Sequence, residues 1–386
     1  MNPHDFLDPV SLDQLPLRYV PAKTEFGRNI TVHTASEPVK KIEEFHLAIL
    51  GVPDDRNAFY KGCSGAPDII RQHLYRLSKF NKSLKIADLG NLKKGPKAED
   101  SYYGLQEVIS WLISNHVIPI VIGGSQDLTY GILLAFEQLK KTVNLVTTDS
   151  KIDLNSKIKE YSSITYLQKI IRQKSSFLFN YTNIGHQSSY VDRDDLELLK
   201  NLYYEAYRLG EIRHDLKLLE PVFRDADVVS MDISAVKQSD APGYFHPSPN
   251  GFYSEDICQL AKYCGLSDHL SVFFIGEVYP EYDHENQTSQ LVAEIIWYFI
   301  DGFSQRKVEH PDDSEHFTKF IVTMDSIDQD LIFFKSEHTD RWWIEIPPLP
   351  NKKGKKRLIA CSHEDYIQAG KKEIPDRWWK AYQKIN

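Results

Sequence analysis

Short apolar runs alternate along this chain with longer segments whose apolar residues recur at helical spacing. Runs of strand length separated by helical patterns are typical of βαβ units, in which helices cover a parallel sheet. The predicted strands are His46–Gly51, Leu84–Leu89, Val117–Ile122, Val143–Thr148, Phe177–Ile184, Asp227–Ile233 and Ser271–Ile275. The pattern therefore predicts an α/β fold, a three-layer sandwich with a mainly parallel sheet.

Two segments carry a clear helical stripe of apolar residues. The first consists of Leu105, Val108, Ile109, Leu112 and Ile113, which share one helix face at this spacing. The second, predicted as a helix over 286–303, repeats the pattern with Leu291, Ile295, Ile296 and Phe299. Each stripe is expected to pack against the sheet.

The chain divides into three parts by pattern. Residues 1–44 show no clear periodicity and are expected to form an N-terminal arm that packs on the core or on a neighbouring subunit. Residues 45–303 form the α/β domain. Residues 304–386 are predicted to be an appended C-terminal segment with strand-like runs at Phe317–Met324, Leu331–Lys335 and Arg341–Pro350.

Paired tryptophans mark the appended segment. In each pair, one tryptophan follows an arginine directly and the other comes one position later; the pairs are Trp342 with Trp343 and Trp378 with Trp379. Tryptophan next to arginine is a frequent combination at protein interfaces. They either form a docking surface for a protein partner or pin the segment onto the main domain. The basic run Asn351–Arg357 is interpreted as a solvated loop, with an acidic partner surface as the alternative.

Composition narrows the classes of function. The 386 residues carry 46 lysines and arginines against 54 acidic residues, a net charge of −8, which argues against nucleic acid as a partner. No apolar run reaches the length of a membrane helix and the N-terminus lacks a signal-peptide pattern, so we expect a cytoplasmic protein with no membrane insertion. The cysteines show no CxxC spacing and are expected to be buried free thiols: Cys63, Cys258, Cys264 and Cys361.

Polar residues follow several predicted strands. Gln126 ends VIGGSQ, Asp149 and Asp153 end NLVTTDSKID, Asp232 lies in SMDIS, and Glu277 lies in GEVYP. Because ligands in open α/β sheets bind outside the carboxyl ends of the strands, these side chains are expected to share one pocket. The acidic residues with a lysine among them suggest a partly dismantled metal site.

Two weaker signals lie at the same strand ends. The glycines of GGSQD could free backbone N–H groups for an anion, although the segment lacks a GxGxxG or GxxxxGKS pattern. His186 in NIGHQSSY is a candidate catalytic residue, with a hydrogen-bonded structural histidine as the alternative.

A series of motifs in order resembles the ureohydrolase family, which includes arginase, agmatinase and formimidoylglutamase. GVPDDRNAFYKGCSGAPDIIRQHL, VIPIVIGGSQDLTYG, TTDSKIDL, SMDIS, APGYFHPSPNGFYSED and GEVYP occur in the family's sequence order between Leu47 and Phe303. The resemblance is closest to formimidoylglutamase-like members. It implies the ureohydrolase (arginase-like) fold, with the C-terminal extension outside it.

The resemblance also implies which residues stand at the family's metal site. Members bind two manganese ions through two histidines and four aspartates, and Glu277 matches a late glutamate that could meet a cationic group. At the six ligand positions this chain has Gln126, Asp149, Lys151, Asp153, Asp232 and Ser234. Three of the six expected ligands are therefore replaced.

Lys151 is the decisive replacement, because an ammonium has no lone pair to offer a metal. We expect it to form salt bridges with the neighbouring aspartates and to stand in for a cation, so that no metal cofactor is needed. The alternative is one weakened manganese site built from Gln126, Asp149, Asp153 and Asp232. A third reading treats the aspartates as unrelated surface residues.

Two classes of function follow from the resemblance and its departures. The first is a pseudoenzyme that has lost dinuclear manganese catalysis and serves as a binding or assembly module, with a protein partner at the C-terminal segment or as a homo-oligomer. The second is a hydrolase of C–N bonds in linear amidines, similar to formimidoylglutamase or agmatinase, that uses one metal or none.

Overall fold

The fold was analysed in a computed structural model of the chain. The structure describes residues 2–11, 22–80, 84–172, 177–312, 315–324, 327, 329–348 and 356–385. The basic run 351–357, predicted as a solvated loop, lies largely outside the described residues.

A ten-stranded sheet forms the centre of the α/β domain, in the order β1-β4-β3-β5-β10-β9-β6-β7-β8 with β2 also paired to β4. All neighbouring strands except the β1–β4 pair run parallel. The main strands are β3 (Leu47–Val52), β4 (Ile86–Leu92), β5 (Ile118–Gly123), β6 (Val143–Thr148), β7 (Leu178–His186), β8 (Glu205–Arg208), β9 (Val228–Asp232) and β10 (Val272–Gly276). The predicted strands are confirmed, and β8 was not predicted.

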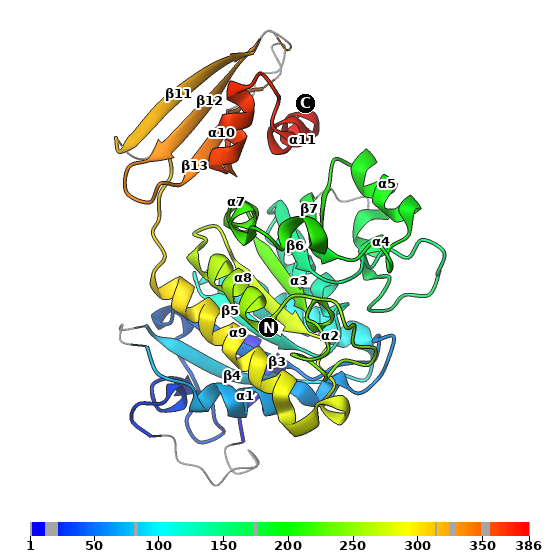
Figure 1. The fold of residues 1–386 in the computed structure, drawn as a ribbon. Coiled ribbons are helices and arrows are strands. Elements are labelled where there is room, and N and C mark those ends of the chain that lie inside the picture. The colour runs from blue at the N-terminus through cyan, green and yellow to red at the C-terminus, as the bar shows by residue number, and fades with distance from the viewer. Residues whose placement is uncertain are drawn as a thin grey trace.

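Helices cover both faces of this sheet (Figure 1). The helices of the domain are α1 (Ala66–Arg76), α2 (Ala98–Ser114), α3 (Leu128–Gln138), α4 (Tyr166–Arg172), α5 (Arg193–Asn201), α6 (Leu209–Ile212), α7 (Glu220–Arg224), α8 (Ser254–Leu266) and α9 (Gln287–Ser304). One core packs α1, α8 and α9 against strand residues such as Ile49, and the other packs α2 and α3 against Ala48 and Leu50. Because successive strand residues point to opposite faces, the two cores alternate along β3. The predicted three-layer fold is confirmed.

The N-terminal arm completes one edge of the sheet. β1 (Leu7–Asp8) pairs antiparallel with β4, and β2 (Thr31–Val32) pairs parallel with a different part of β4. Leu7 is buried in the core that α2 and α3 share. Of the two expected places for the arm, the described residues therefore take the one on the domain's own core.

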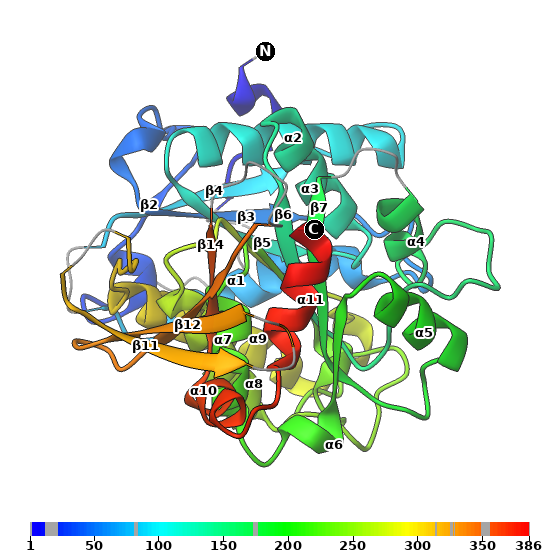
Figure 2. The same ribbon diagram turned by 90° about the horizontal axis from the view of Figure 1, so that it is seen from above.

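The appended segment is a separate small layer of structure. Four antiparallel strands in sequence order, β11 (Phe317–Met324), β12 (Gln329–Ser336), β13 (Trp342–Ile346) and β14 (Arg357–Cys361), carry α10 (His363–Gly370) and α11 (Asp376–Ile385). Its own apolar core includes Leu331, Phe333, Ile344 and Trp378. Figure 2 shows this unit lying over one side of the α/β domain, with α11 crossing near β6 and β7.

The tryptophans of the appended unit do not form a shared docking surface. Trp342, Trp343 and Trp378 are 7%, 4% and 1% exposed, and only Trp379 is 41% exposed. Trp378 donates from its indole to the carbonyl of Glu345 at 2.9 Å inside the unit's own core. Of the two interpretations of these tryptophans, the burial of Trp342, Trp343 and Trp378 favours packing within the chain.

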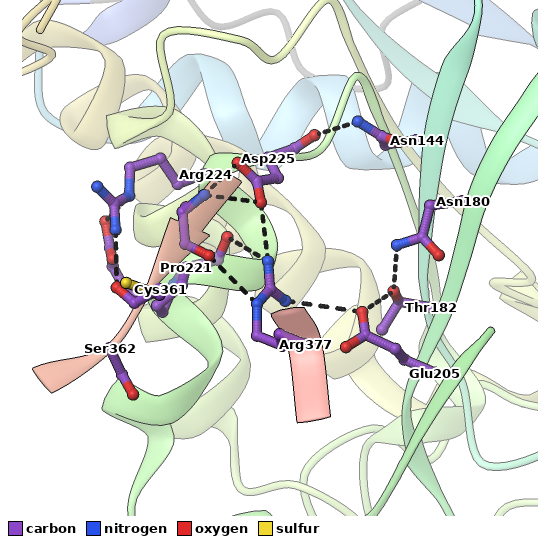
Figure 3. Close-up of polar contacts among 12 residues, drawn as sticks. Asn144, Asn180, Thr182, Glu205, Pro221, Arg224, Asp225, Cys361, Ser362 and Arg377 are labelled. Atoms are coloured by element: carbon purple, nitrogen blue, oxygen red, sulfur yellow. Dashed lines mark hydrogen bonds and ion pairs between the residues drawn. The ribbon is translucent and has the colours of Figure 1, made fainter. Parts of the chain in front are cut away.

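Buried charges join the appended unit to the α/β domain. The guanidinium of Arg377 on α11 lies 2.8 Å from Asp225 and 3.6 Å from Glu205 on β8. Figure 3 shows Arg377 between these two carboxylates. The backbone N–H of Ala360 on β14 donates to both oxygens of Asp225 at 3.0 Å. Each of these contacts ties the end of the chain to the domain that precedes it.

Two expectations on solvent exposure can be compared with the structure. The four cysteines are buried and unpaired, as predicted. Across the described ranges, no helix combines the length and apolar character needed to cross a membrane.

Candidate metal centre

The residues that follow four neighbouring strands converge at one edge of the sheet. Gln126 follows β5, Asp149 follows β6, Asp232 ends β9 and Glu277 follows β10, and these strands are adjacent in the order β5-β10-β9-β6. Parallel strands place their carboxyl ends at the same edge, so the polar residues meet in the crevice that such sheets use for ligands. The structure thus brings these strand-end residues together at one edge of the sheet.

Three aspartates form the centre of this pocket. One carboxylate oxygen each of Asp149, Asp153 and Asp232 lies within 4.8 Å of the others, and the side chains are no more than 5% exposed. The interpretation as unrelated surface aspartates is therefore wrong. Carboxylate oxygens at this spacing are suitable ligands for a hard divalent cation such as Mn²⁺ or Mg²⁺.

Repulsion among the three buried carboxylates favours binding of a cation or a proton at the cluster. Burial raises the pKa of Asp153 well above its usual range, and the charges of Asp149 and Asp232 raise it further. Burial also raises the pKa of Asp232, with Asp149 and Glu277 acting in the same direction. Like charges held this close cannot all ionise without compensation. A bound cation would remove the same repulsion that a shared proton removes.

Hydrogen-bond donors of the chain itself already contact carboxylate oxygens of Asp149 and Asp232. Oδ1 of Asp149 accepts from the Lys151 backbone N–H at 2.8 Å and from the Ser234 hydroxyl at 3.1 Å. Oδ1 of Asp232 accepts from the Ser234 backbone N–H at 2.6 Å. These oxygens sit next to the replaced positions, and protein donors already occupy their lone pairs.

Lys151 does not form the expected salt bridges. Among the described residues, no carboxylate lies within 4.0 Å of its ammonium, and the side chain is half-buried beside a surface pocket of about 470 Å³ that Asp153 also lines. The backbone of Lys151 is held on both sides, by its N–H bond to Asp149 and by a bond from Asn183 Nδ2 to its carbonyl at 2.8 Å. The prediction of a lysine that replaces the cation by direct contact is therefore wrong. Its charge acts at longer range and lowers the pKa of Asp149 and Asp153 against the larger effect of burial.

Gln126 carries a buried side-chain oxygen at the same edge of the sheet as the aspartates. Its side-chain amide donates from Nε2 to Ser230 Oγ at 2.7 Å, while its Oε1 is buried and accepts no hydrogen bond from any described residue. An orphaned buried carbonyl oxygen is costly unless something binds it. Asp149, Asp153 and Asp232 therefore fit one oxygen-ligated cation, and the buried Oε1 of Gln126 is a further candidate ligand. The residues do not fit two, because Lys151 and Ser234 offer the second ion no anionic ligand.

Glu277 lies beside this cluster with both oxygens engaged. Oε1 accepts from the Gln126 backbone N–H at 2.7 Å, and Oε2 accepts from the Tyr279 hydroxyl at 2.6 Å. Burial raises the pKa of Glu277 to about 7, although these hydrogen bonds oppose the rise. The raised pKa makes the neutral form of Glu277 more accessible than that of a free carboxyl. Tyr279, within the motif GEVYP, is a site residue whose role the sequence alone does not reveal.

His186 is separated from the aspartate cluster. It ends β7, is 4% exposed, and lines a pocket of about 330 Å³ together with Arg208 and Arg213. Burial lowers its pKa, and its Nδ1 has no hydrogen-bond partner among the described residues. It is not one of the residues whose ligand atoms form the metal cluster.

The glycine turn of GGSQD supports the neighbouring Glu277. The carbonyl of Gly124 accepts a hydrogen bond from the Glu277 backbone N–H at 2.8 Å.

The fold and the strand-end acidic cluster define an α/β protein of the ureohydrolase class. The arginase family matches residues 45–301, and the chain belongs to this family. The formimidoylglutamase of Staphylococcus aureus (strain JH9) is 24% identical over 292 residues, which cover 72% of this chain and 94% of that protein. The family match over residues 45–301 corresponds to the α/β domain without the appended unit.

Solved structures share the same fold. Trypanosoma cruzi formiminoglutamase with Mn²⁺ superposes with a TM-score of 0.64 at 21% identity, covering 70% of this chain and 97% of that one. Formimidoylglutamase from Bacillus subtilis gives a TM-score of 0.67 at 19% identity, covering 76% and 97%. These likenesses establish the arginase-like fold of the domain.

Proposed function

We propose that this arginase-family chain has lost dinuclear manganese hydrolysis and that its α/β domain serves as a binding or assembly module. The observation that carries the proposal is the contact between Ser234 and Asp149. A neutral hydroxyl donates to the aspartate oxygen where the resemblance places a metal-binding carboxylate. Lys151, at the next replaced position, offers no lone pair to an ion.

The chemistry of the family makes this loss consequential. A metal-bound water becomes a nucleophile near neutral pH because the cation lowers its pKa, and a pair of ions holds that water between them. Among the described residues, the group of Asp149, Asp153 and Asp232 supplies carboxylate ligands for one ion in this region. In addition, Tyr279 occupies the Glu277 oxygen that could otherwise accept from a cationic substrate.

A competing function is hydrolysis of C–N bonds in linear amidines with a single metal. The three clustered aspartates favour it, since a mononuclear site can also lower the pKa of water. The relatives named formimidoylglutamase give the substrate class to test. In that case Asp149, Asp153, Asp232 and Gln126 would hold the ion.

If the chain has a binding role, a partner can contact only the residues of the appended unit that are exposed. Trp379 and Ile367 are 41% and 42% exposed on α11 and α10. We propose that another protein, or a second copy of the chain, contacts this side of the unit. The mass of the purified chain in solution, with and without Trp379→Ala, tests the self-association arm directly.

The deciding experiment is the metal content of the full chain after incubation with excess Mn²⁺ and removal of unbound ion, combined with an assay on formimidoylglutamate. Less than about one tenth of an ion per chain and no turnover support the binding role. One ion with turnover supports the mononuclear hydrolase. Two ions per chain would overturn the proposed loss of the dinuclear centre, whatever the activity.

A further inference from the structure

A cleft lies where the appended unit meets the α/β domain, and its lining contains none of the clustered aspartates. Its volume is about 780 Å³, within the range of small-molecule sites. Arg224 on α7 and Tyr263 on α8 line it from the α/β domain, and Arg341 and Trp342 line it from the appended unit. Both units therefore contribute to one concave surface.

The lining of the cleft is positively charged in an acidic protein. Five basic side chains face three carboxylates, a net charge of +2, whereas the chain carries −8. The basic residues are Lys217, Arg224, Lys307, Lys335 and Arg341, and the acidic ones are Glu220, Asp340 and Glu364. Within the described parts of the chain, Lys217 and Lys307 have no carboxylate within 4.0 Å. Their charges are free to meet a ligand.

Arg224 lines the cleft, and its contacts with the chain hold its side chain in a fixed orientation. Its Nη2 donates to the carbonyl of Trp342 at 2.9 Å and to that of Cys361 at 3.3 Å, and its guanidinium lies 4.3 Å from the Trp343 ring centroid. Figure 3 shows the side chain extended toward Cys361. Arg224 is 2% exposed, yet its Nη1 has no acceptor among the described residues. A buried guanidinium nitrogen without an acceptor is unusual, and this N–H can still donate to an anion in the cleft.

A single carboxylate serves two of the arginines. Oε1 of Glu220 lies 3.3 Å from Nε of Arg224 and 3.2 Å from Nε of Arg341. Arg306, which lies next to Lys307 in the sequence, also has a buried nitrogen, Nη2, without an acceptor in the described chain. Burial lowers the pKa of Arg306 to about 10, and the charge of Arg341 lowers it too, against the pull of Asp268. Arg224, Arg306 and Arg341 therefore have fewer carboxylate partners than their charges could bind.

We propose that the junction cleft binds a small polyanion that carries at least two phosphate or carboxylate groups. Guanidinium groups match the planar, bidentate geometry of both kinds of anion, and lysines add charge at the rim. Tyr263, Leu266 and Pro221 supply apolar contact for the carbon skeleton of such a ligand. Because none of the clustered aspartates lines this cleft, the inference does not rest on the proposed function.

Titration calorimetry on the full chain tests the site with two probes, inorganic pyrophosphate and citrate, at constant ionic strength. The test variant is Lys217→Gln/Lys307→Gln, which changes two exposed side chains of the lining. The matched control is Lys200→Gln/Lys319→Gln, which changes two exposed lysines elsewhere and alters net charge equally. Both variants leave the buried arginines in place, so the fold is not at risk.

We expect saturable binding of at least one probe at one site per chain. The affinity should fall about tenfold in the cleft variant and stay within about twofold in the control. A preference for pyrophosphate or for citrate identifies the kind of anion. Equal affinities in the two variants, or no saturable binding of either probe to the unaltered chain, would overturn the proposal.

Discussion

The hydroxyl of Ser234 donates a hydrogen bond to Oδ1 of Asp149 at 3.1 Å, across the gap between the ends of β9 and β6. Ser234 in turn accepts from the hydroxyl of Ser150 at 3.2 Å. A short chain of neutral groups therefore occupies this side of the aspartate cluster. The cluster still holds three carboxylates, and Gln126 Oε1 accepts no hydrogen bond from the described part of the chain.

Restoration of the replaced ligands should create a second metal position. The triple variant Gln126→His, Lys151→His and Ser234→Asp adds two imidazoles and one carboxylate around the existing aspartates. We expect manganese content to rise to about two ions per chain, because each ion then has anionic or imidazole ligands on both sides. Atomic absorption of the dialysed protein measures the content.

A control for this variant carries Asp149→Asn in addition, which removes one anionic ligand from the cluster. We expect that chain to bind no more than one ion. If the triple variant takes up no more metal than the unaltered protein, the assignment of these positions to the metal site is wrong.

Stability in the absence of metal should depend on pH through Asp153. A carboxyl whose folded pKa is raised contributes stability that is complete below its unfolded value and is lost as pH rises through the folded value. Burial and the neighbouring aspartates raise the pKa of Asp153, so Asp153→Asn should stabilise the chain more at pH 8 than at pH 5. Urea unfolding with a chelator present at both pH values measures the difference.

Asp192 provides the opposite case for comparison. A hydrogen bond from Lys157 lowers the pKa of this exposed carboxyl, so its contribution changes only below its ordinary value of 3.8. The effect of Asp192→Asn should therefore be the same at pH 5 and pH 8. An effect of Asp153→Asn that is equally flat would show that the aspartate cluster does not share a proton.

Arg377 should be important for stability because it compensates two carboxylates at the junction. Its side chain is 13% exposed, and Glu205 and Asp225 are 6% and 26% exposed. Arg377→Met leaves these charges without their partner, and we expect a loss of about 3 kcal/mol in the free energy of unfolding. Chemical denaturation of the variant measures the loss.

The exposed pair Arg208–Glu211 gives a control of the same chemistry. Its side chains are 48% and 61% exposed, so Arg208→Met should cost less than about 1 kcal/mol. Equal losses in the Arg377 and Arg208 variants would mean that the junction charges are already well solvated.

The adjacent tryptophans of α11 allow an internal comparison. Trp378 is 1% exposed, stacks on Tyr382 with ring centroids 4.9 Å apart and belongs to the core of the appended unit. Trp378→Ala should destabilise that unit by about 3–5 kcal/mol, whereas Trp379→Ala should change stability by less than about 1 kcal/mol. Tryptophan fluorescence and limited proteolysis follow the unfolding of this unit. Similar losses in both variants would place Trp379 in a packed contact.

Much of the α/β domain could be predicted from the sequence because its strands are buried on both faces. Runs such as Val143–Thr148 are apolar enough to stand out, and parallel strands with glycine and proline between them leave few other arrangements. β8 was missed because Glu205 and Arg208 break the apolar run. Its polar residues make sense only with Arg377 beside them, and that residue lies far away in the sequence.

The residues of the candidate site could also be predicted from the sequence, but their geometry could not. Strand ends placed Asp149, Asp232 and Gln126 together. The direction of the Lys151 side chain depends on how Asn183 and Asp149 hold its backbone, which no local pattern encodes. Trp378 likewise follows an arginine in a polar helix, and only the tertiary contact with Glu345 explains why it is buried.

The contacts of α11 also constrain the order of events during synthesis. Glu205 and Asp225 belong to the α/β domain, yet their charge partner Arg377 is made only after the whole appended sheet. On a ribosome, the domain would therefore emerge with two carboxylates uncompensated at its surface, held open to water until α11 arrives. Completion of the last helix is the step that closes this side of the protein.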